Sequence, residues 1–230
     1  MKNDILNVLV LFGGRSGEHE VSRQSARAVV ANLDPERYRV LLVGITKEGK
    51  WIRPSAGEKI FASGEKVFAA GQGDAAGDQV ILPVARGEGV LLVKQGDAWK
   101  EDGKIDVVFP VLHGTFGEDG SLQGMLDLAG VPYVGSGVLG SAAGMDKAVM
   151  KRLFRVAGLP IVDSCAFSRA RWEKEGAAVV REVSGKLGFP CFVKPANLGS
   201  SVGISKARSE SELEGAIRVA AEYDSRLVVE

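Results

Sequence analysis

The chain has 230 residues, which is enough for two domains of ordinary size or one large domain. Its hydrophobic content of 45% and charged content of 25% are typical of a soluble globular protein with a packed core. Its 29 basic residues balance its 29 acidic residues, so net charge gives no general attraction to nucleic acid or to an anionic membrane.

The first elements predict a parallel β-sheet. Residues 7–12 form a continuous apolar run before two glycines, as in a strand buried on both faces. This run is far shorter than the roughly 20 residues of a membrane span. Apolar residues then recur at helical spacing until Asp34-Pro35, and residues 40–45 form a second buried strand. A strand–helix–strand order predicts a right-handed crossover between parallel strands.

The following region is less regular. Residues 46–104 contain many glycines and short apolar pieces, and we interpret them as peripheral hairpin and loop. Residues 107–112 predict another central strand, residues 122–129 a helix that Ser121 can cap, and residues 131–134 a short strand. We expect the first domain to end near Gly144.

The second domain is predicted to begin with a helix over residues 147–157, closed by Gly158. Strand signals at residues 190–194 and 202–206 flank a Gly/Ser loop, and strands joined in this way are usually antiparallel. A capping signature at Ser209 or Ser211 starts a further helix, whose buried stripe is Leu213, Ala216, Ile217 and Ala220.

The last residues, 227–230, form an apolar strand with no turn or polar tail after it. We therefore expect the sequence to have been cut from a longer one. Only Cys165 and Cys191 are present, without metal-ligand or redox spacing. Together with two histidines in all, this argues against a zinc site, and the cytoplasm is the expected compartment.

The first motif, residues 13–22, reads Gly-Gly-Arg-Ser-Gly-Glu-His-Glu-Val-Ser. It follows the first strand, and ligands of open parallel sheets bind at the carboxyl ends of strands. The acidic cluster there suits a cationic group. Alternatively, Glu18 and Glu20 complement the helix dipole, and spacing alone leaves both interpretations open. Because G-x-G-x-x-G is missing, a dinucleotide site is only weakly indicated.

The second motif, residues 113–121, follows another central strand and reads His-Gly-Thr-Phe-Gly-Glu-Asp-Gly-Ser. Its glycines allow a ligand to approach the backbone. His113 is either structural or part of a ligand pocket facing the first motif. Met145-Asp146-Lys147, the third motif, says little by itself, since a solvated lysine is the simpler interpretation.

The fourth motif, residues 192–203, places Lys194 at the end of an apolar strand before a Gly/Ser loop. Consecutive backbone N–H groups in such a loop form an anion-binding nest, to which the lysine adds a point charge. Phosphate binding fits this pattern, although it is not a P-loop. An ordinary hairpin loop is the alternative.

These four motifs, in this order, resemble those of the D-alanine–D-alanine ligases, and the resemblance covers essentially the whole chain, with residues 55–105 loosely matched. It implies an α/β protein of the ATP-grasp class. Residues 1–144 would form a Rossmann-like, parallel-sheet domain that binds the first substrate. Residues 145–230 would form the first α+β subdomain of the ATP-grasp fold, truncated before the second.

The resemblance also implies roles for individual residues. Glu18 would hold the ammonium of the first D-alanine, with Ser200 in the same hydrogen-bond network and His113 lining the pocket. Lys147 and Lys194 would contact ATP phosphates. The loop would close over the phosphates through Gly199, Ser201 and Gly203, and Glu230 would begin the hinge that binds adenine.

The implied reaction joins two D-alanines for peptidoglycan precursor synthesis through an acyl phosphate made with ATP. Magnesium ligands and the second-substrate pocket would follow Glu230, so no metal ligand is named here and the chain alone is expected to be inactive. A D-alanine–D-lactate or D-alanine–D-serine ligase of the vancomycin-resistance type stays open, as does a non-catalytic nucleotide-binding module. A Rossmann-like oxidoreductase is disfavoured by the missing G-x-G-x-x-G. The partner would be D-alanine, without nucleic acid or membrane, and the family implies a possible homodimer.

Overall fold

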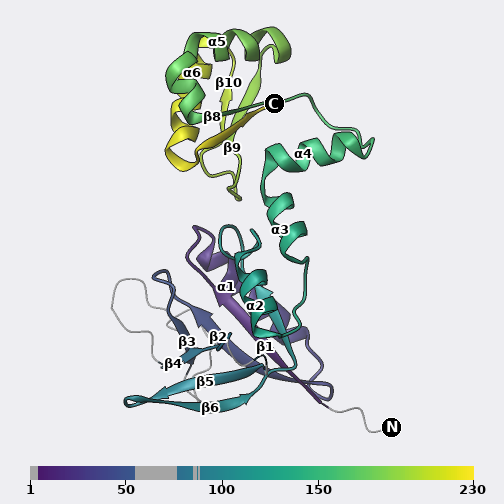
Figure 1. The fold of residues 1–230 in the computed structure, drawn as a ribbon, viewed down its shortest axis with the longest axis vertical. Helices are drawn as coiled ribbons and strands as arrows, with labels where there is room; N and C mark the ends of the chain where they lie inside the picture. The colour runs from purple at the N-terminus through teal and green to yellow at the C-terminus, as the bar shows by residue number, and fades with distance from the viewer. Residues whose placement is uncertain (1–4, 55–76, 85–86, 88) are drawn as a thin grey trace. The chain divides into compact units, whose positions relative to one another are not determined.

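The structure, a computed structural model, describes residues 5–54, 77–84, 87 and 89–230. The chain forms two compact units, Met1–Leu139 and Gly140–Glu230, and each is described by itself (Figure 1). The division falls within helix α3 (Val138–Met145), a few residues before Gly144, where we expected the first domain to end. Over the described residues, every helix is too short or too polar to span a bilayer.

Three parallel strands form the centre of the first unit: β2 (Tyr38–Ile45), β1 (Leu6–Gly13) and β7 (Val107–Val111). Strand β1 lies between the other two and is buried on both faces. Leu9 and Leu11 point into one hydrophobic core, and Val8, Val10 and Phe12 into another. This double burial explains the unbroken apolar run, and the predicted α/β class with a parallel core is confirmed.

Four antiparallel strands extend this sheet on the β2 side, so the whole sheet is mixed. They are β3 (Trp51–Pro54), β4 (Gly77–Ile81), β5 (Val90–Gln95) and β6 (Ala98–Lys104), in the order β6-β5-β4-β3-β2-β1-β7. The predicted hairpin exists as β5–β6, at the sheet edge (Figure 1). Our interpretation of the region as peripheral was wrong for β3 and β4, which continue the central sheet. Residues 55–76, part of the same prediction, lie outside the described residues.

Two helices flank the parallel core. Helix α1 (His19–Asn32) makes the predicted crossover between β1 and β2, and α2 (Ser121–Ala129) follows β7. Gly120, with φ of 92°, caps α2 and Ser121 is its first residue, so the cap predicted at Ser121 was wrong. The short strand predicted over residues 131–134 is a single parallel bridge between Val108 and Tyr133, because Pro132 has no N–H to continue a ladder.

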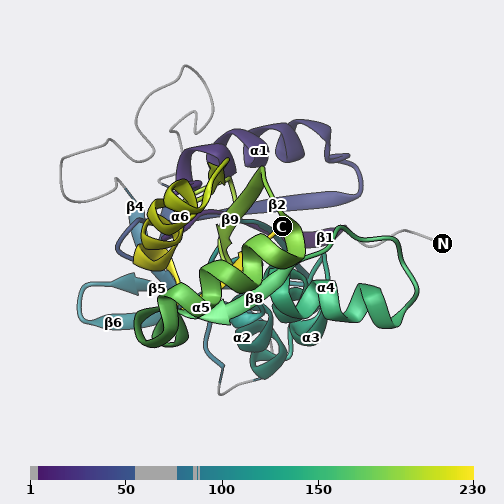
Figure 2. The same ribbon diagram turned by 90° about the horizontal axis from the view of Figure 1, so that it is seen from above.

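The second unit contains, in chain order, α4 (Lys147–Val156), β8 (Cys165–Ser168), α5 (Arg169–Leu187), β9 (Cys191–Pro195), β10 (Ser205–Ala207), α6 (Glu210–Tyr223) and β11 (Arg226–Val229). The four strands form an antiparallel sheet in the order β10-β9-β11-β8. Helices α5 and α6 pack side by side over one face of this sheet (Figures 1 and 2).

The predicted buried stripe of α6 is confirmed, since Leu213, Ala216, Ile217 and Ala220 all lie in the core of this unit. Ser209 caps the helix by accepting a hydrogen bond from the Glu212 N–H at 3.3 Å. The antiparallel pairing of β9 with β10 is confirmed as well. Strand β10 begins at Ser205, later than the predicted start at residue 202, because Gly203 has a φ of 69°, which a strand does not allow.

Candidate functional site

The carboxyl end of β1 is fixed by a buried hydroxyl. Ser22 of α1 accepts a hydrogen bond from the Gly13 N–H at 2.7 Å and donates to the Val111 carbonyl of β7. The buried His19 ring contacts the Gly14 carbonyl through Nδ1 at 2.8 Å. The first motif is therefore held against β1 and β7 by its own polar side chains, which gives the loop after β1 one defined path.

Glycine is required at Gly13. Its φ is +87°, and an added Cβ would lie 2.4 Å from the Ile45 carbonyl oxygen. We expect Gly13→Ala to lower the free energy of unfolding by about 2 kcal/mol or more, from left-handed backbone strain together with this collision. Chemical denaturation measures the change. Gly17→Ala is the matched control, because a Cβ there meets nothing within 4 Å. Equal effects of the two substitutions would contradict the steric argument.

The first and second motifs meet in the first unit. The Glu18 carboxylate comes so close to Gly114 that a Cβ there would lie 2.8 Å from Glu18 Oε2. His113 Nε2 lies 3.2 Å from the Ser25 hydroxyl of α1. Within the described residues, Glu18 makes no side-chain capping bond to α1. A carboxylate, a hydroxyl and an imidazole therefore gather at the carboxyl ends of β1 and β7.

The loop of the second motif is organised by its own acidic residues. Glu118 Oε2 accepts a hydrogen bond from the Gly114 N–H at 2.8 Å. Asp119 accepts hydrogen bonds from the N–H groups of Phe116 and Ser121, at 2.8 and 3.0 Å. These carboxylates shape the loop that carries His113, a role that the sequence analysis did not assign to them.

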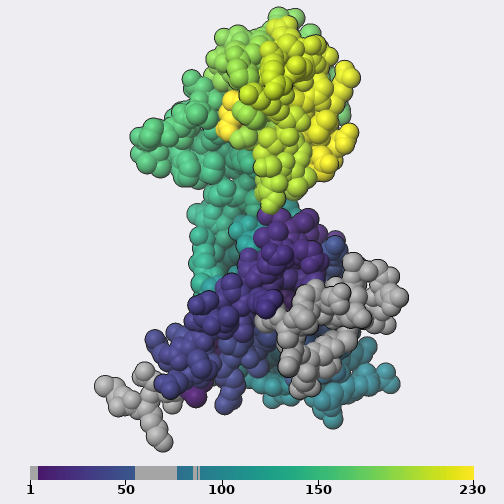
Figure 3. Space-filling view, turned by 180° about the vertical axis from the view of Figure 1, so that it is seen from behind, coloured from purple at the N-terminus to yellow at the C-terminus, as the bar shows by residue number. Residues whose placement is uncertain are grey.

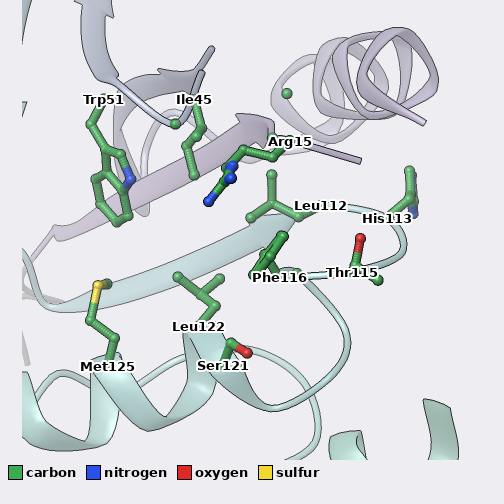
Figure 4. A pocket seen from close by; sticks show the side chains of 14 residues that line it. Arg15, Ile45, Trp51, Leu112, His113, Thr115, Phe116, Ser121, Leu122 and Met125 are labelled. Atoms are coloured by element: carbon green, nitrogen blue, oxygen red, sulfur yellow. The ribbon is translucent and has the colours of Figure 1, made fainter. Parts of the chain in front are cut away.

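A pocket of about 220 Å³ lies beside this cluster. Figure 4 shows Ile45, Trp51, Leu112, Leu122 and Met125 pointing toward a common space, with Thr115 and His113 toward its margin. The Arg15 guanidinium lies 4.9 Å from the centre of the Phe116 ring, a cation–π contact. The pocket therefore combines an apolar floor with one fixed cation.

The second cluster belongs to the second unit and begins at the start of α4. Asp146 caps this helix by accepting hydrogen bonds from the N–H groups of Ala148 and Val149. Lys147, the first helical residue, donates hydrogen bonds from its ammonium group to the carbonyl oxygens of Ala196 and Leu198. Its backbone N–H donates to Ala196 O at 3.0 Å. All three hydrogen bonds tie Lys147 to the loop that follows β9.

Two lysines converge on one carboxylate at the end of β11. Glu230 Oε1 accepts from Lys194 Nζ, and Glu230 Oε2 lies 2.5 Å from Lys151 Nζ. Burial opposes ionisation of Glu230, but the two lysine hydrogen bonds outweigh it and lower the pKa of the carboxyl. Burial, followed by repulsion from Lys194, lowers the pKa of Lys147. The cluster thus concentrates positive charge.

The loop between β9 and β10 projects from the body of its unit (Figures 1 and 3). Ser200 and Ser201 have φ of 48° and 61°, and the Val202 N–H donates to the Gly199 carbonyl at 3.2 Å. A Cβ at Gly203 would lie 2.7 Å from the Tyr223 ring. Successive tight turns of this kind present backbone N–H groups that can bind an anion.

The predicted site residues thus gather in two clusters. Glu18 and His113 lie together in the first unit, and Lys147, Lys194 and Glu230 lie together in the second. The remaining four form the loop beside the second cluster: Gly199, Ser200, Ser201 and Gly203. The predicted network between Ser200 and Glu18 joins different units and stays a prediction.

Lys151 was missed by the sequence analysis. The sequence feature that could have identified Lys151 is its position four residues after Lys147, which places both lysines on one face of α4. Among the described residues, no group of three His, Cys, Asp or Glu side chains is arranged to hold a metal ion. Three lysines and a turn-rich loop are groups that fit a polyphosphate.

Family models match both units of the chain. A model described as D-ala D-ala ligase N-terminus matches residues 7–136, and one described as D-ala D-ala ligase C-terminus matches residues 153–230. The chain is 46% identical over 225 residues to a D-alanine–D-alanine ligase of Natranaerobius thermophilus, covering 98% of this chain and 59% of that relative. It is also 46% identical to the D-alanine–D-alanine ligase of Bacillus licheniformis, covering 96% and 59%. The chain therefore spans about three fifths of these relatives.

Solved structures give the same result. The VanG D-Ala:D-Ser ligase from Enterococcus faecalis superimposes with a TM-score of 0.82 at 36% identity, over 99% of this chain and 62% of that one. The D-alanine-D-alanine ligase from Coxiella burnetii superimposes with a TM-score of 0.81 at 34% identity, over 99% and 61%. The fold of the described residues is thus shared with ligases of two acceptor types.

Proposed function

Because this chain belongs to the D-alanine–D-alanine ligase family, we propose that it supplies the first-substrate site and half of the nucleotide site of an ATP-dependent ligase that joins two D-alanines. The observation that carries the proposal is the lysine cluster at the end of β9. Lys147 and Lys194 lie beside a turn-rich loop in the second unit, and Lys194 falls within the residues that the C-terminal family model matches. Cations and N–H groups held in place are what a transferring phosphoryl group needs.

In this proposal, ATP supplies the phosphoryl group that activates the carboxylate of the first D-alanine. Lys147 and Lys194 bind its phosphates as fixed point charges, aided by N–H groups of the loop from Gly199 to Gly203. Lys147 is already anchored by two carbonyls, so its ammonium needs little reorganisation to meet an anion. Closure of the loop would exclude water from an activated carboxylate that hydrolyses readily.

Glu18 would hold the ammonium of the first D-alanine. Its carboxylate lies at the carboxyl end of the parallel core, where the Gly114 backbone has no side chain to obstruct it. His113 would line the same pocket, with its ring oriented through the Ser25 hydroxyl. Ser200 would join this network when the loop closes, as the family resemblance implies.

Family membership supports further features. Magnesium would be held by residues other than those described. Residues 1–144 and 145–230 are proposed as the first-substrate domain and the first ATP-grasp subdomain. On the same basis we propose that the protein is a cytoplasmic enzyme that supplies peptidoglycan precursors and that it forms a homodimer. Light scattering of the purified protein tests the dimer.

The acceptor is tested with a version of the protein that spans the full length of its relatives. Phosphate release should require ATP and D-alanine together, and D-alanine should be a better second substrate than D-serine or D-lactate. The curated relatives at 46% identity carry the D-alanine name, whereas the likeness to VanG favours D-serine as the second candidate. Faster turnover with D-serine would assign that activity. Nucleotide binding without phosphate release under any of these conditions would make the protein a non-catalytic nucleotide-binding module.

A further inference from the structure

Lys151 is the only lysine that is buried among the described residues, with 9% of its surface exposed. An ammonium group loses its hydration when it is buried, so a buried lysine requires a charged partner. Lys151 lies one helical turn after Lys147 in α4, and its partner is Glu230, 2.5 Å away. The partner follows β11, at the opposite end of the unit's sequence, so this ion pair joins α4 to the end of the sheet.

The partner is shared. One carboxylate oxygen of Glu230 pairs with the Lys151 ammonium, and the other accepts a hydrogen bond from the Lys194 ammonium. The remaining lysine of the cluster, Lys147, bonds to backbone carbonyls instead. Three lysines and one glutamate give a formal charge of +2 (three positive and one negative). If Lys151 were absent, the charge would fall to +1, and the half-buried Glu230 would have Lys194 as its sole ammonium partner.

A carboxylate and a phosphate compete for the same ammonium group. Without a second cation, Glu230 would hold Lys194 tightly, because removing Lys194 would leave a partly buried carboxylate unpaired. With Lys151 in place, Glu230 keeps an ion pair when Lys194 turns toward another anion. The arrangement therefore lowers the free energy needed to move Lys194 from Glu230 to a phosphate.

We propose that Lys151 is a positioning residue: it keeps Glu230 paired and so frees Lys194 to donate to a nucleotide phosphate. The inference rests on the proposed function, in which Lys194 binds phosphate. Lys151 acts through Glu230 and need not touch the nucleotide. When a polyphosphate binds, Lys194 exchanges Glu230 for a phosphate oxygen, while Lys151 retains Glu230.

Tripolyphosphate is the probe for this exchange, because it has no adenine that Glu230 could contact through the predicted hinge. Its dissociation constant is measured by calorimetry on a version of the protein that spans the full length of its relatives. Lys151→Met keeps the length of the side chain but removes its charge, and should raise the dissociation constant by about tenfold or more. Lys151→Arg keeps the charge and should bind nearly as the parent does. Lys174→Met, at an exposed position of α5, is the control for the loss of one distant charge.

The double variant Lys151→Met/Glu230→Gln separates charge from packing. It removes both members of the pair, restores the formal charge to +2, and should recover the affinity of the parent for tripolyphosphate. It also leaves no unpaired carboxylate, so it should fold even if Lys151→Met does not. A double variant as weak as Lys151→Met, or a Lys151→Met that binds like the parent, would overturn the inference. No binding of tripolyphosphate or ATP by the parent would instead contradict the proposed function itself.

The ionisation of Glu230 is a second readout that does not depend on activity. The hydrogen bonds from Lys151 and Lys194 hold the pKa of Glu230 below its ordinary value, although burial acts in the opposite direction. Carbon-13 NMR of the carboxyl group should show this pKa rising in Lys151→Met and staying low in Lys151→Arg. An unchanged pKa in Lys151→Met would show that Lys194 alone controls Glu230, against the inference.

Discussion

Lys194→Ala should lower the turnover of a version of the protein that spans the full length of its relatives by about a hundred- to a thousand-fold, the usual loss when one charge-stabilising donor is removed. Lys194 is the penultimate residue of β9, on the strand that leads into the loop proposed to bind phosphate, and its ammonium pairs with Glu230. Alanine removes that cation, so Glu230 keeps only its ion pair with Lys151 and the cluster becomes less positive by one charge.

The rate and the stability must be measured together for this variant. The unfolding midpoint should stay close enough to that of the parent for the protein to be folded under assay conditions. Lys174→Ala, which removes an exposed lysine of the same unit, should leave the turnover unchanged. If Lys194→Ala turns over like the parent, Lys194 is a structural partner of Glu230 and the phosphate assignment is wrong.

Glu18→Gln should raise the Michaelis constant for the first D-alanine by roughly ten- to a hundredfold, because a hydrogen bond to a charged group is lost. The Michaelis constant for ATP should change much less, since Glu18 belongs to the cluster around Gly114 in the first unit. Initial rates at varied concentrations of each substrate separate the two constants.

The matched control is Glu20→Gln, two residues further along the chain. Glu20 is exposed and pairs with Arg23 at 2.7 Å, and an exposed pair of this kind contributes little to stability. It should leave both constants unchanged. Equal increases for D-alanine and ATP in Glu18→Gln, or an unfolding midpoint that accounts for the loss, would remove Glu18 from the substrate site.

The central strands and the Gly/Ser loop after β9 could be predicted from local sequence patterns. The apolar run of β1 is unbroken since both faces are covered by cores, and helix α6 shows its buried stripe at regular spacing. Glycines next to the strands that lead into the predicted site mark backbone conformations that other residues rarely adopt. In each of these cases the pattern that indicates the element lies within the residues of the element itself.

Helix α5 could not be predicted in the same way. Its helical geometry breaks at Glu175, and only Val179, Val180 and Val183 are buried along its 19 residues, so the apolar periodicity is short. Ser168 caps the helix, but one serine is too common to mark a helix start. The antiparallel strands β3 and β4 were missed because their pairing depends on partners far along the chain.

The ion pairs of the lysine cluster in the second unit could not be predicted from local sequence either. Lys147 and Lys194 were named through the family motifs, whereas only its spacing of four residues from Lys147 distinguishes Lys151 in the sequence. Its partner Glu230 is distant in sequence, and no local pattern predicts an ion pair of that kind. Charge pairing between segments that are far apart is a property of the folded unit, which is why it had to be found there.

The loop from Gly199 to Gly203 carries serine at two consecutive positions where the backbone is left-handed. Each non-glycine residue in that conformation costs about 1–2 kcal/mol, and glycine would remove this cost. The serines thus make the loop less stable than the same backbone allows, in return for two hydroxyl groups at the place proposed to meet phosphate. Methods that select sequences by folded stability alone would replace these serines with glycine, and the loop would keep its shape while losing its hydroxyl groups.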